Sequence, residues 1–538
     1  MDSWSQPVSG WHCPGADSTC EMTIRRRDFL SHMAAGSAVL TVPAFLNGCS
    51  VQQAMSVAEP TPENPFMDWF GLDQATVARV MAELTANGAD IADLYFQHSR
   101  SSSLSLQDGV VSDARTEIEQ GVGLRVVIAG QTGFAYTEGL TLPSMLAAAQ
   151  MASAIAVGES VATPQAFVAK NMGALYVTSV PWADVGTDQK LPVLRYIEEK
   201  ARAKDPSIEK VSVHWGDVDE RVMIAKLDGN LVTDYRPMTR ATVLTTARNG
   251  EEVQTGYSTI AAREEFSWYT DERLDAMVEE AVDRTMILFD ARRPPEGEMP
   301  VILSAGASGI VLHEAIGHGL EADFNRDGTS IYSDMMGEKV AGPLVTVVDQ
   351  ATIPGERGAL NYDDEGNRAG RTVLVENGTL SSYLHDRVSA GQYNVQPTGS
   401  GRRQSYKFAP MPRMSCTFME DGPHTRDEII EAVGNGIICE TFTNGQVQIG
   451  AGNYTFNVRN GWLVEGGRIT APIKNVSISG NGPETLKRIS MVADDARLDK
   501  GGWTCGKNGQ SVPVSQGMPT VLVTGMNVGR GTDRGAGA

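Results

Sequence analysis

Two histidines and a glutamate lie within six residues of one another, directly after an apolar run. They belong to the stretch Gly309-Ile-Val-Leu-His313-Glu314-Ala-Ile-Gly317-His318, and the run Met299–Ser304 before them has the composition of a strand. Paired histidines beside a glutamate are typical of zinc hydrolases, in which the imidazoles bind the metal and the glutamate is the general base. His313 and His318 are therefore candidate metal ligands, and Glu314 is a candidate base.

The spacing of the two histidines is unusual for one face of a helix. At about 100° per residue, a five-residue step separates two side chains by roughly 140°, whereas a four-residue step separates them by roughly 40°. His313 and His318 can reach one metal ion only if the helix widens into a π-type turn or ends there. Gly317 and Gly319 favour an ending, because glycine readily adopts the backbone angles of a helix C-terminus.

A metal site needs a third ligand, and the sequence offers several. Candidates are the scattered carboxylates, His385, His424 and the cysteines. A chance match to the short histidine pattern is the alternative, since most helical histidines are surface residues or satisfied core residues. The third ligand decides between these interpretations.

Length and charge limit the class of protein. A chain of 538 residues can form two or three domains with substantial cores, and 41% hydrophobic residues indicate a globular protein. The formal net charge of −21 repels phosphate backbones, and no basic stripe is present, so we expect no nucleic-acid partner.

The first 49 residues predict an export segment rather than a folded element. Arg25-Arg-Arg-Asp-Phe-Leu30 matches the twin-arginine pattern, and the apolar stretch Met33–Leu46 is too short for a spanning helix. Met22 is a second candidate start. Leu46-Asn-Gly-Cys49 resembles a lipobox, which makes Cys49 a candidate for lipidation. We expect an exported protein, periplasmic or anchored to the membrane through Cys49, with a cytoplasmic location as the alternative.

The remaining chain predicts two halves with different patterns. Residues 50–65 read as a linker, 66–292 as an N-terminal α+β domain, 293–527 as a β-rich C-terminal domain with the metal helix, and 528–538 as a tail. Helices and strands come in runs rather than in strict alternation, which favours an α+β architecture. The predicted helices are 72–86, 142–157, 193–203, 271–289 and 425–433. The predicted strands are 93–97, 103–106, 123–128, 210–215, 222–227, 299–304, 371–375, 445–449 and 454–458.

Several blocks resemble a known family and stand in the family's order along the chain. His313-Glu314-x3-His318-Gly-Leu-Glu-Ala-Asp323 resembles the signature of the TldD side of the TldD/PmbA metalloproteases. Cys505-Gly-Lys-Asn-Gly-Gln-Ser-Val-Pro-Val514 is the more specific block, and the similarity covers roughly residues 70–527. The other matching blocks are Met411–Met414, Gly445–Val447 and Ile469–Lys474.

This resemblance implies a complete site. Cys505 would join His313 and His318 as the third zinc ligand, and Glu314 would activate a water molecule for the hydrolysis of peptide bonds in unfolded or extended polypeptides. Glu321 and Asp323 are candidates to orient a ligand imidazole, or alternatively form a solvated helix end. The family also implies a chamber formed by two subunits, the second being a PmbA (TldE)-like chain or another copy.

Other interpretations stay open at this point. Glu314, His318 and Cys505 are an alternative ligand set, because Glu314 and His318 have the four-residue spacing that shares a helix face. The chain could also be a non-catalytic peptide-binding subunit, or a zinc amidase that acts on cell-wall peptides. An odd number of cysteines follows residue 49, so Cys416, Cys439 and Cys505 cannot all pair with one another. The roles of Cys416 and Cys439 are not indicated by the sequence.

Overall fold

The structure is a computed structural model that describes residues 64–531, apart from 157, 159–162, 171–172, 174 and 177. The predicted export segment with Cys49, most of the linker and the tail beyond residue 531 lie outside the described residues. Within the part of the chain that is described, no helix is both long and apolar enough to cross a membrane.

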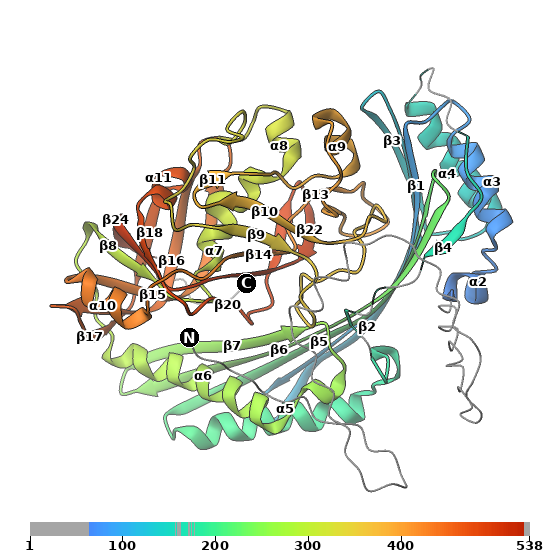
Figure 1. The fold of residues 1–538 in the computed structure, drawn as a ribbon. Helices are drawn as coiled ribbons and strands as arrows, with labels where there is room; N and C mark the ends of the chain where they lie inside the picture. The colour runs from blue at the N-terminus through green and yellow to red at the C-terminus, as the bar shows by residue number, and fades with distance from the viewer. Residues whose placement is uncertain are drawn as a thin grey trace, which may run out of the picture. The chain divides into compact units, whose positions relative to one another are not determined.

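The first half is built on a seven-stranded sheet of order β3-β2-β1-β5-β6-β4, with β7 paired to β6 (Figure 1). The pairing of β4 with β6 is parallel, and the others are antiparallel. The strands are β1 (Ile91–Gln107), β2 (Val110–Ile128), β3 (Gln131–Thr137), β4 (Val168–Lys170), β5 (Ile208–Lys226), β6 (Asn230–Asn249) and β7 (Glu252–Ala262).

The strands of this sheet are longer than the sequence predicts. The runs predicted at 93–97 and 103–106 are one strand, and those at 210–215 and 222–227 are also one strand. The polar residues between the first two runs lack apolar alternation. They are nonetheless part of the strand, because their backbones pair with both neighbouring strands: Ser99 pairs with Glu119 of β2 and with Glu220 of β5. Cross-strand hydrogen bonds therefore extend β1 where side-chain burial does not.

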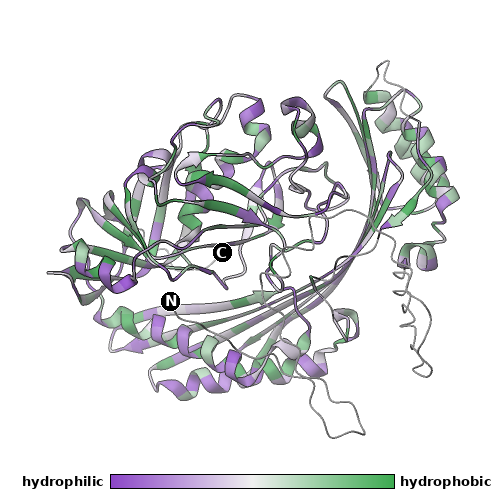
Figure 2. Cartoon of the chain, viewed as in Figure 1, coloured by the Kyte–Doolittle hydropathy of each residue, from purple (hydrophilic) through white to green (hydrophobic). Residues whose placement is uncertain are grey.

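Helices cover one face of this sheet at both ends of the long strands. Leu94 and Phe96 of β1 belong to the core that includes α3 and α4, and Leu104 and Leu106 belong to the core that includes α5 and α6. All four side chains are an even number of residues apart and share a face. Along α6, hydrophilic and hydrophobic residues alternate, as in an amphipathic helix (Figure 2). The helices are α2 (Pro65–Phe70), α3 (Gln74–Leu84), α4 (Leu142–Ile155), α5 (Thr187–Lys204) and α6 (Asp271–Asp290), with 3₁₀ turns η1 (Trp182–Asp184) and η2 (Phe266–Trp268).

The second half is rich in strands, which confirms the predicted α+β class. One sheet has the order β11-β10-β9-β14-β23-β20, and another has the order β15-β8-β24-β18-β16-β17 with β19 on β24. An additional pairing of β15 with β16 closes the second sheet into a ring. Its strands are β8 (Gly297–Leu303), β15 (Gly436–Gln448), β16 (Asn453–Glu465), β17 (Arg468–Ile473), β18 (Val476–Asn481), β19 (Ile489–Val492) and β24 (Val521–Arg530).

Shorter elements complete this half. The six-stranded sheet is formed by β9 (Val347–Gln350), β10 (Arg371–Glu376), β11 (Thr379–Leu380), β14 (Cys416–Met419), β20 (Arg497–Leu498) and β23 (Ser515–Met518). Two small pairs are β12 (Gly401–Arg402) with β13 (Met411–Pro412), and β21 (Thr504–Lys507) with β22 (Gln510–Pro513). The helical segments are α7 (Gly309–Leu312), η3 (His313–Gly317), η4 (His318–Leu320), α8 (Ala322–Arg326), α9 (Arg387–Tyr393), α10 (Arg426–Val433) and α11 (Gly482–Lys487).

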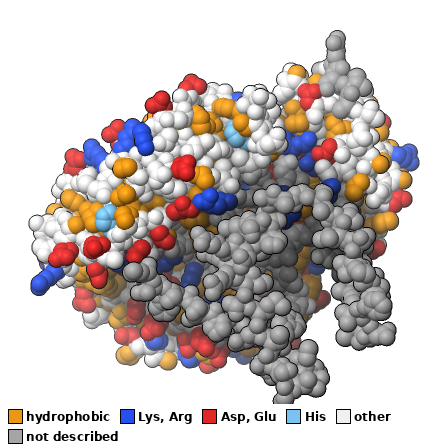
Figure 3. Space-filling view, in the orientation of Figure 1, with side chains coloured by type: hydrophobic (Ala, Val, Ile, Leu, Met, Phe, Trp, Pro, Cys, Tyr) orange, Lys and Arg blue, Asp and Glu red, His pale blue; other side chains and the backbone are white. Residues whose placement is uncertain are grey.

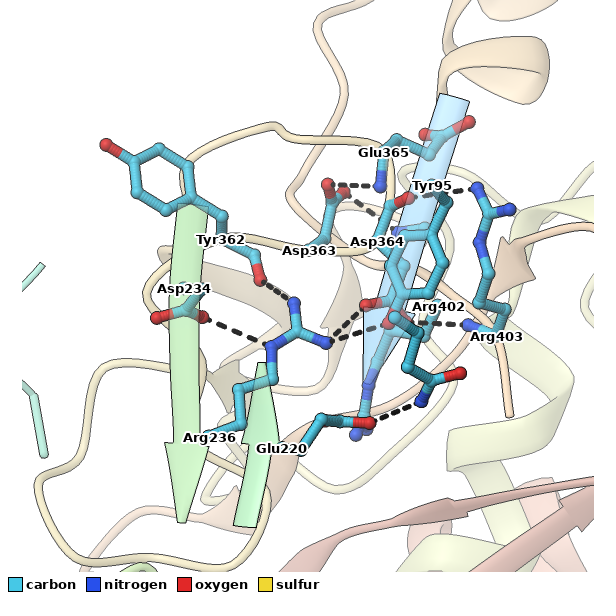
Figure 4. Close-up of polar contacts among 12 residues, drawn as sticks. Tyr95, Glu220, Asp234, Arg236, Tyr362, Asp363, Asp364, Glu365, Arg402 and Arg403 are labelled. Carbon is cyan, nitrogen blue, oxygen red and sulfur yellow. Dashed lines mark hydrogen bonds and ion pairs between the residues drawn. The ribbon is translucent and has the colours of Figure 1, made fainter. Parts of the chain in front are cut away.

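A buried ionic network, here called the clasp, joins the first sheet to the second half of the chain (Figure 4). Arg236 Nη1 lies 2.5 Å from Asp364 Oδ1, and Arg403 Nη2 lies 2.9 Å from Asp93 Oδ1. Asp93, Tyr95 and Gln97 of β1 thus face the second half, while the residues between them, Leu94 and Phe96, face the helices. The clasp consists of Asp93, Arg125, Asp234, Arg236, Asp364, Glu365 and Arg403, all of them buried.

Candidate metal centre

The two histidines lie where the helix changes its winding. After one α-helical turn, α7, residues His313–Gly317 form a π-turn in which the His318 N–H donates to the His313 carbonyl, and a 3₁₀ turn follows. A π-turn has more than four residues per turn, so a five-residue step returns to the same face. The widening that the spacing predicts is therefore confirmed.

The reason for the glycines differs from the one predicted. Gly317 has φ −54° and ψ −57°, which are ordinary helical angles rather than those of a helix end. A Cβ on Gly317 would lie 2.2 Å from Met414 Sδ, and one on Gly319 would lie 2.5 Å from the Tyr332 ring. Close packing, not backbone freedom, requires glycine at both positions.

Cys505 of β21 meets the two imidazoles. Its Sγ lies 3.3 Å from His313 Nε2 and 3.4 Å from His318 Nε2. Nitrogen and sulfur ligands bound tetrahedrally to one zinc ion at about 2.1 and 2.3 Å would be about 3.6 Å apart, so the donor set fits such an ion. In the described part of the chain these three residues are the one cluster of His, Cys, Asp and Glu side chains with metal-binding spacing. Glu314 is not in this cluster, which disfavours the alternative ligand set.

The charges around the cluster favour a thiolate. Burial raises the pKa of the Cys505 thiol, but His313 and His318 outweigh burial and lower it to about 5. Burial also opposes protonation of His318, yet the Glu321 carboxylate raises the pKa of this imidazole well above its usual value. The thiolate is the metal-binding form of cysteine, whereas His318 must lose a proton before it binds a metal.

Glu321 orients one of the two imidazoles. Its Oε2 lies 3.0 Å from His318 Nδ1, so it holds the ring with Nε2 toward Cys505. Burial would raise the pKa of Glu321, but Lys507 and His318 lower it to about 2. Asp323 contacts no imidazole of the described residues; its Oδ1 accepts from Lys507 Nζ at 2.6 Å. Of the two carboxylates predicted to orient a ligand, the structure places one at a histidine and the other at a lysine.

Three residues that the sequence did not single out also belong to this site. Lys507 lies 3.1 Å from Glu321 Oε2, and its place two residues after Cys505 in the same block was an available clue. Arg413 donates to the Cys505 carbonyl at 2.6 Å, which explains the block Met411–Met414. Gln516 is buried, and neither its amide nitrogen nor its oxygen has a partner among the described residues. No sequence pattern indicated Gln516.

A cavity of about 490 Å³ opens onto the cluster. Glu314 lines it beside both histidines and Cys505, and so do Gln516 and the segment Gly445–Val447 of β15. A carboxylate next to three metal-ligand side chains, in a space large enough for a peptide segment, can act as a general base.

The remaining candidate ligands lie elsewhere. Burial lowers the pKa of His385 to about 4, and its Nδ1 lies 3.2 Å from Ser389 Oγ. His424 Nδ1 lies 3.1 Å from the Val492 carbonyl. Cys416 and Cys439 are unpaired thiols whose pKa burial raises, and both are buried in strands. They act as small core side chains rather than as ligands.

Comparisons with known proteins agree with this site. Three models of the PmbA/TldA metallopeptidase family match the chain: domain 1 over residues 92–156, the central domain over 180–289 and the C-terminal domain over 296–530. The chain belongs to this metallopeptidase family.

Individual relatives cover most of the chain. It is 37% identical over 465 residues to the metalloprotease TldD homolog of Haemophilus influenzae, which covers 85% of this chain and 96% of that protein. It is 28% identical over 344 residues to the zinc metalloprotease TldD homolog of Saccharolobus solfataricus, covering 64% and 76%. The crystal structure of TldE from Thermococcus kodakarensis has the same fold, with a TM-score of 0.63, 18% identity and coverage of 84% and 99%.

Proposed function

We propose that this protein is a zinc-dependent peptidase that hydrolyses peptide bonds in unfolded or extended polypeptides. One observation carries the proposal: the Nε2 atoms of His313 and His318, Cys505 Sγ and the Glu314 carboxylate converge on one cavity. Two imidazoles and one thiolate leave a fourth zinc position open, which is typical of catalytic rather than structural zinc. The relative named a zinc metalloprotease supports the choice of metal.

The residues divide the chemistry between them. A zinc ion held by His313, His318 and Cys505 would supply Lewis acidity to the scissile carbonyl and lower the pKa of water. Glu314 accepts a proton from the attacking water and then donates it to the leaving amine. Glu321 keeps the His318 ring in place, and Lys507 keeps Glu321 charged.

An open strand edge is the place where we propose that the peptide binds. β15 pairs with β16 along its length but with β8 only through Ile437–Cys439 in the described residues. The edge of Gly445–Val447 is therefore free where these residues line the metal cavity. An extended peptide can add to such an edge through main-chain hydrogen bonds, which select chain conformation rather than sequence.

Two substitutions test the proposal on the purified full chain. Glu314→Gln should abolish hydrolysis of an unfolded protein such as reduced casein while zinc content stays at the parent level. Cys505→Ala should lose the zinc as well, measured by elemental analysis. Zinc retained by Cys505→Ala would refute the ligand set, and zinc lost by Glu314→Gln would refute the role of Glu314 as a base.

Location and assembly are part of the same proposal. The twin-arginine pattern supports export, and this route carries folded proteins that have already bound their metal. The fold shared with a TldE supports a partner of the TldE type, or a second copy of this chain. Fractionation of cells that express the full chain, with and without Arg26→Lys and Arg27→Lys, tests export. Light scattering of the purified protein tests assembly.

A further inference from the structure

The metal cavity has a larger neighbour that shares part of its wall. This second cavity, of about 1680 Å³, is lined by β6 and β7 of the first sheet and by residues of the second half. Trp503 and Thr504, directly before Cys505, line both cavities. A chain bound at the metal site can therefore continue past these two residues into the larger space.

Positive side chains line the larger cavity. Arg240, Arg497 and Lys500 line the larger cavity, and none of their side chains forms an ion pair or hydrogen bond with another described residue. Arg240 lies close to the loop before Cys505, because its Nε is 3.6 Å from where a Cβ on Gly502 would be. A guanidinium turned to a cavity without a partner is suited to bind an anion from solution.

A further arginine adds charge behind the wall. Arg357 donates from Nε to the Trp503 carbonyl at 3.2 Å and from Nη2 to Thr504 Oγ1 at 3.3 Å. Burial lowers the pKa of Arg357, and the charges of Arg240, Arg263 and Arg402 lower it further, to about 9. Arg357 therefore lies within the positive field of these three arginines.

Several carboxylates that line the same cavity already have partners. Asp499 accepts from Trp503 Nε1 at 2.5 Å, and Glu440 lies 3.1 Å from Arg426 Nη2. Glu280 lies 2.7 Å from Arg284 Nη2. Glu272 and Asp283 also line the cavity, but they belong to α6 and not to the loop before Cys505. Asp499 lies beside Lys500 in the loop, whereas none of the carboxylates that line the cavity pairs with the Arg240 side chain in the described residues.

We propose that Arg240, with Lys500 and Arg497 in the same cavity, is a subsite for a carboxylate of the bound peptide. The subsite rests on the proposed peptidase function, and it narrows the substrates to peptides with a carboxylate some residues away from the scissile bond. This carboxylate is either the C-terminus of the peptide or the side chain of an Asp or Glu residue in it. Arg357 is a positioning residue, because it holds the Trp503–Thr504 wall and adds to the positive potential.

Equilibrium binding tests the subsite without relying on hydrolysis. The protein is the full chain with Glu314→Gln, so that labelled peptides stay intact during fluorescence anisotropy titrations. Four versions of one unstructured peptide carry either a free or an amidated C-terminus, and either Glu or Gln at one internal position. Comparing the free with the amidated C-terminus, and Glu with Gln, identifies which carboxylate binds.

We expect peptide affinity to depend on the carboxylate. At least one acid-bearing peptide should bind about tenfold or more tightly than its neutral match, as one charge-assisted contact implies, and Arg240→Gln should remove this difference. Arg240→Lys should retain part of it. Arg284→Gln is the matched control, because Arg284 lines the same cavity but is paired with Glu280, and should leave the difference unchanged.

Three results would overturn the subsite: no peptide binds, acidic and neutral peptides bind equally, or the difference persists in Arg240→Gln. The two proposals also fail separately. Hydrolysis by the parent protein with no preference for the carboxylate would refute the subsite alone. Carboxylate-dependent binding without any hydrolysis by the zinc-loaded parent would refute the peptidase proposal alone.

Discussion

The metal centre and the clasp are both buried clusters of charged side chains, but they differ in what surrounds them. Every clasp residue faces another charged or polar group of the protein, and none lines either cavity. The metal-centre residues leave the Glu314 carboxylate and the Gln516 amide turned to a cavity. Both clusters contain strongly shifted pKa values, for example those of Arg236 and His318. A shifted pKa therefore indicates a functional site only together with accessible space.

Charged side chains on the surface differ from both buried clusters, because water surrounds them. On the face drawn in Figure 3, Asp and Glu side chains are scattered among basic ones over the described surface. Exposed pairs such as Arg115 with Asp113 contribute little to stability because water screens them. Substituting a charged residue should therefore have different consequences in the clasp, in the metal centre and on the surface.

The largest effect on stability is expected in the clasp. Arg236→Ala leaves Asp234 and Asp364 buried without their partner, which should lower the free energy of unfolding by about 3–5 kcal/mol. Chemical denaturation followed by circular dichroism measures this change. Arg115→Ala, which breaks an exposed pair, is the control and should change the same quantity by less than about 0.5 kcal/mol. Similar losses for the two variants would show that the clasp is not a buried, mutually dependent network.

The next effect concerns metal affinity rather than folding. Glu321→Gln weakens the group that orients His318, and the loss of such partners reduces zinc affinity by about 10- to 100-fold. Competition with a chromogenic chelator measures the affinity. Asp323→Asn is the matched control, since Asp323 contacts Lys507 and not a ligand, and a smaller loss is expected. An equal loss in both variants would contradict the specific role of Glu321.

A smaller effect is expected from the packing that supports the π-turn. In Gly317→Ala the added Cβ would overlap Met414 Sδ, so the overpacked turn should cost about 1–3 kcal/mol of unfolding free energy and also weaken zinc binding. Gly370→Ala is the control, because nothing lies within 4 Å of the position its Cβ would take. If Gly317→Ala keeps both stability and zinc affinity, the close approach to Met414 is not what requires glycine.

A change in the pH dependence of stability is expected beside the clasp. Burial, and then the charge of Glu365, raises the pKa of Asp363 to about 7 from an ordinary value of 3.8. The folded state thus holds this proton more tightly than the unfolded state. The resulting stabilisation is complete below pH 3.8 and is lost as the pH rises to about 7. Asp363→Asn should remove this contribution.

Denaturation of both proteins at a series of pH values across this range measures the difference. The parent should lose more stability than Asp363→Asn between the acidic and the neutral end. Parallel pH profiles of the two proteins would indicate that folding does not raise the pKa of Asp363.

Local patterns predicted the elements whose stability is local. The helices at 72–86, 271–289 and 425–433 correspond to α3, α6 and α10, each of which has a capping side chain at its start: Asp73, Thr270 and Thr425. The π-turn followed from the spacing of His313 and His318 by helix geometry alone. The middle of β1 was missed, because its partners in β2 and β5 stabilise it rather than its own apolar pattern.

The type of chemistry follows from a short stretch of sequence: two imidazoles, a neighbouring carboxylate and a turn that must widen to bring them together. Cys505 was predicted as a ligand only through resemblance to a family, since no local pattern links residues 192 positions apart. Which side chains meet depends on the packing of the whole chain: Glu321 lies at His318, Arg413 at the Cys505 carbonyl, and Arg240 beside the loop that forms the wall of the metal cavity. Distances between remote residues depend on how sheets and loops pack, and this information is not contained in any short stretch of sequence.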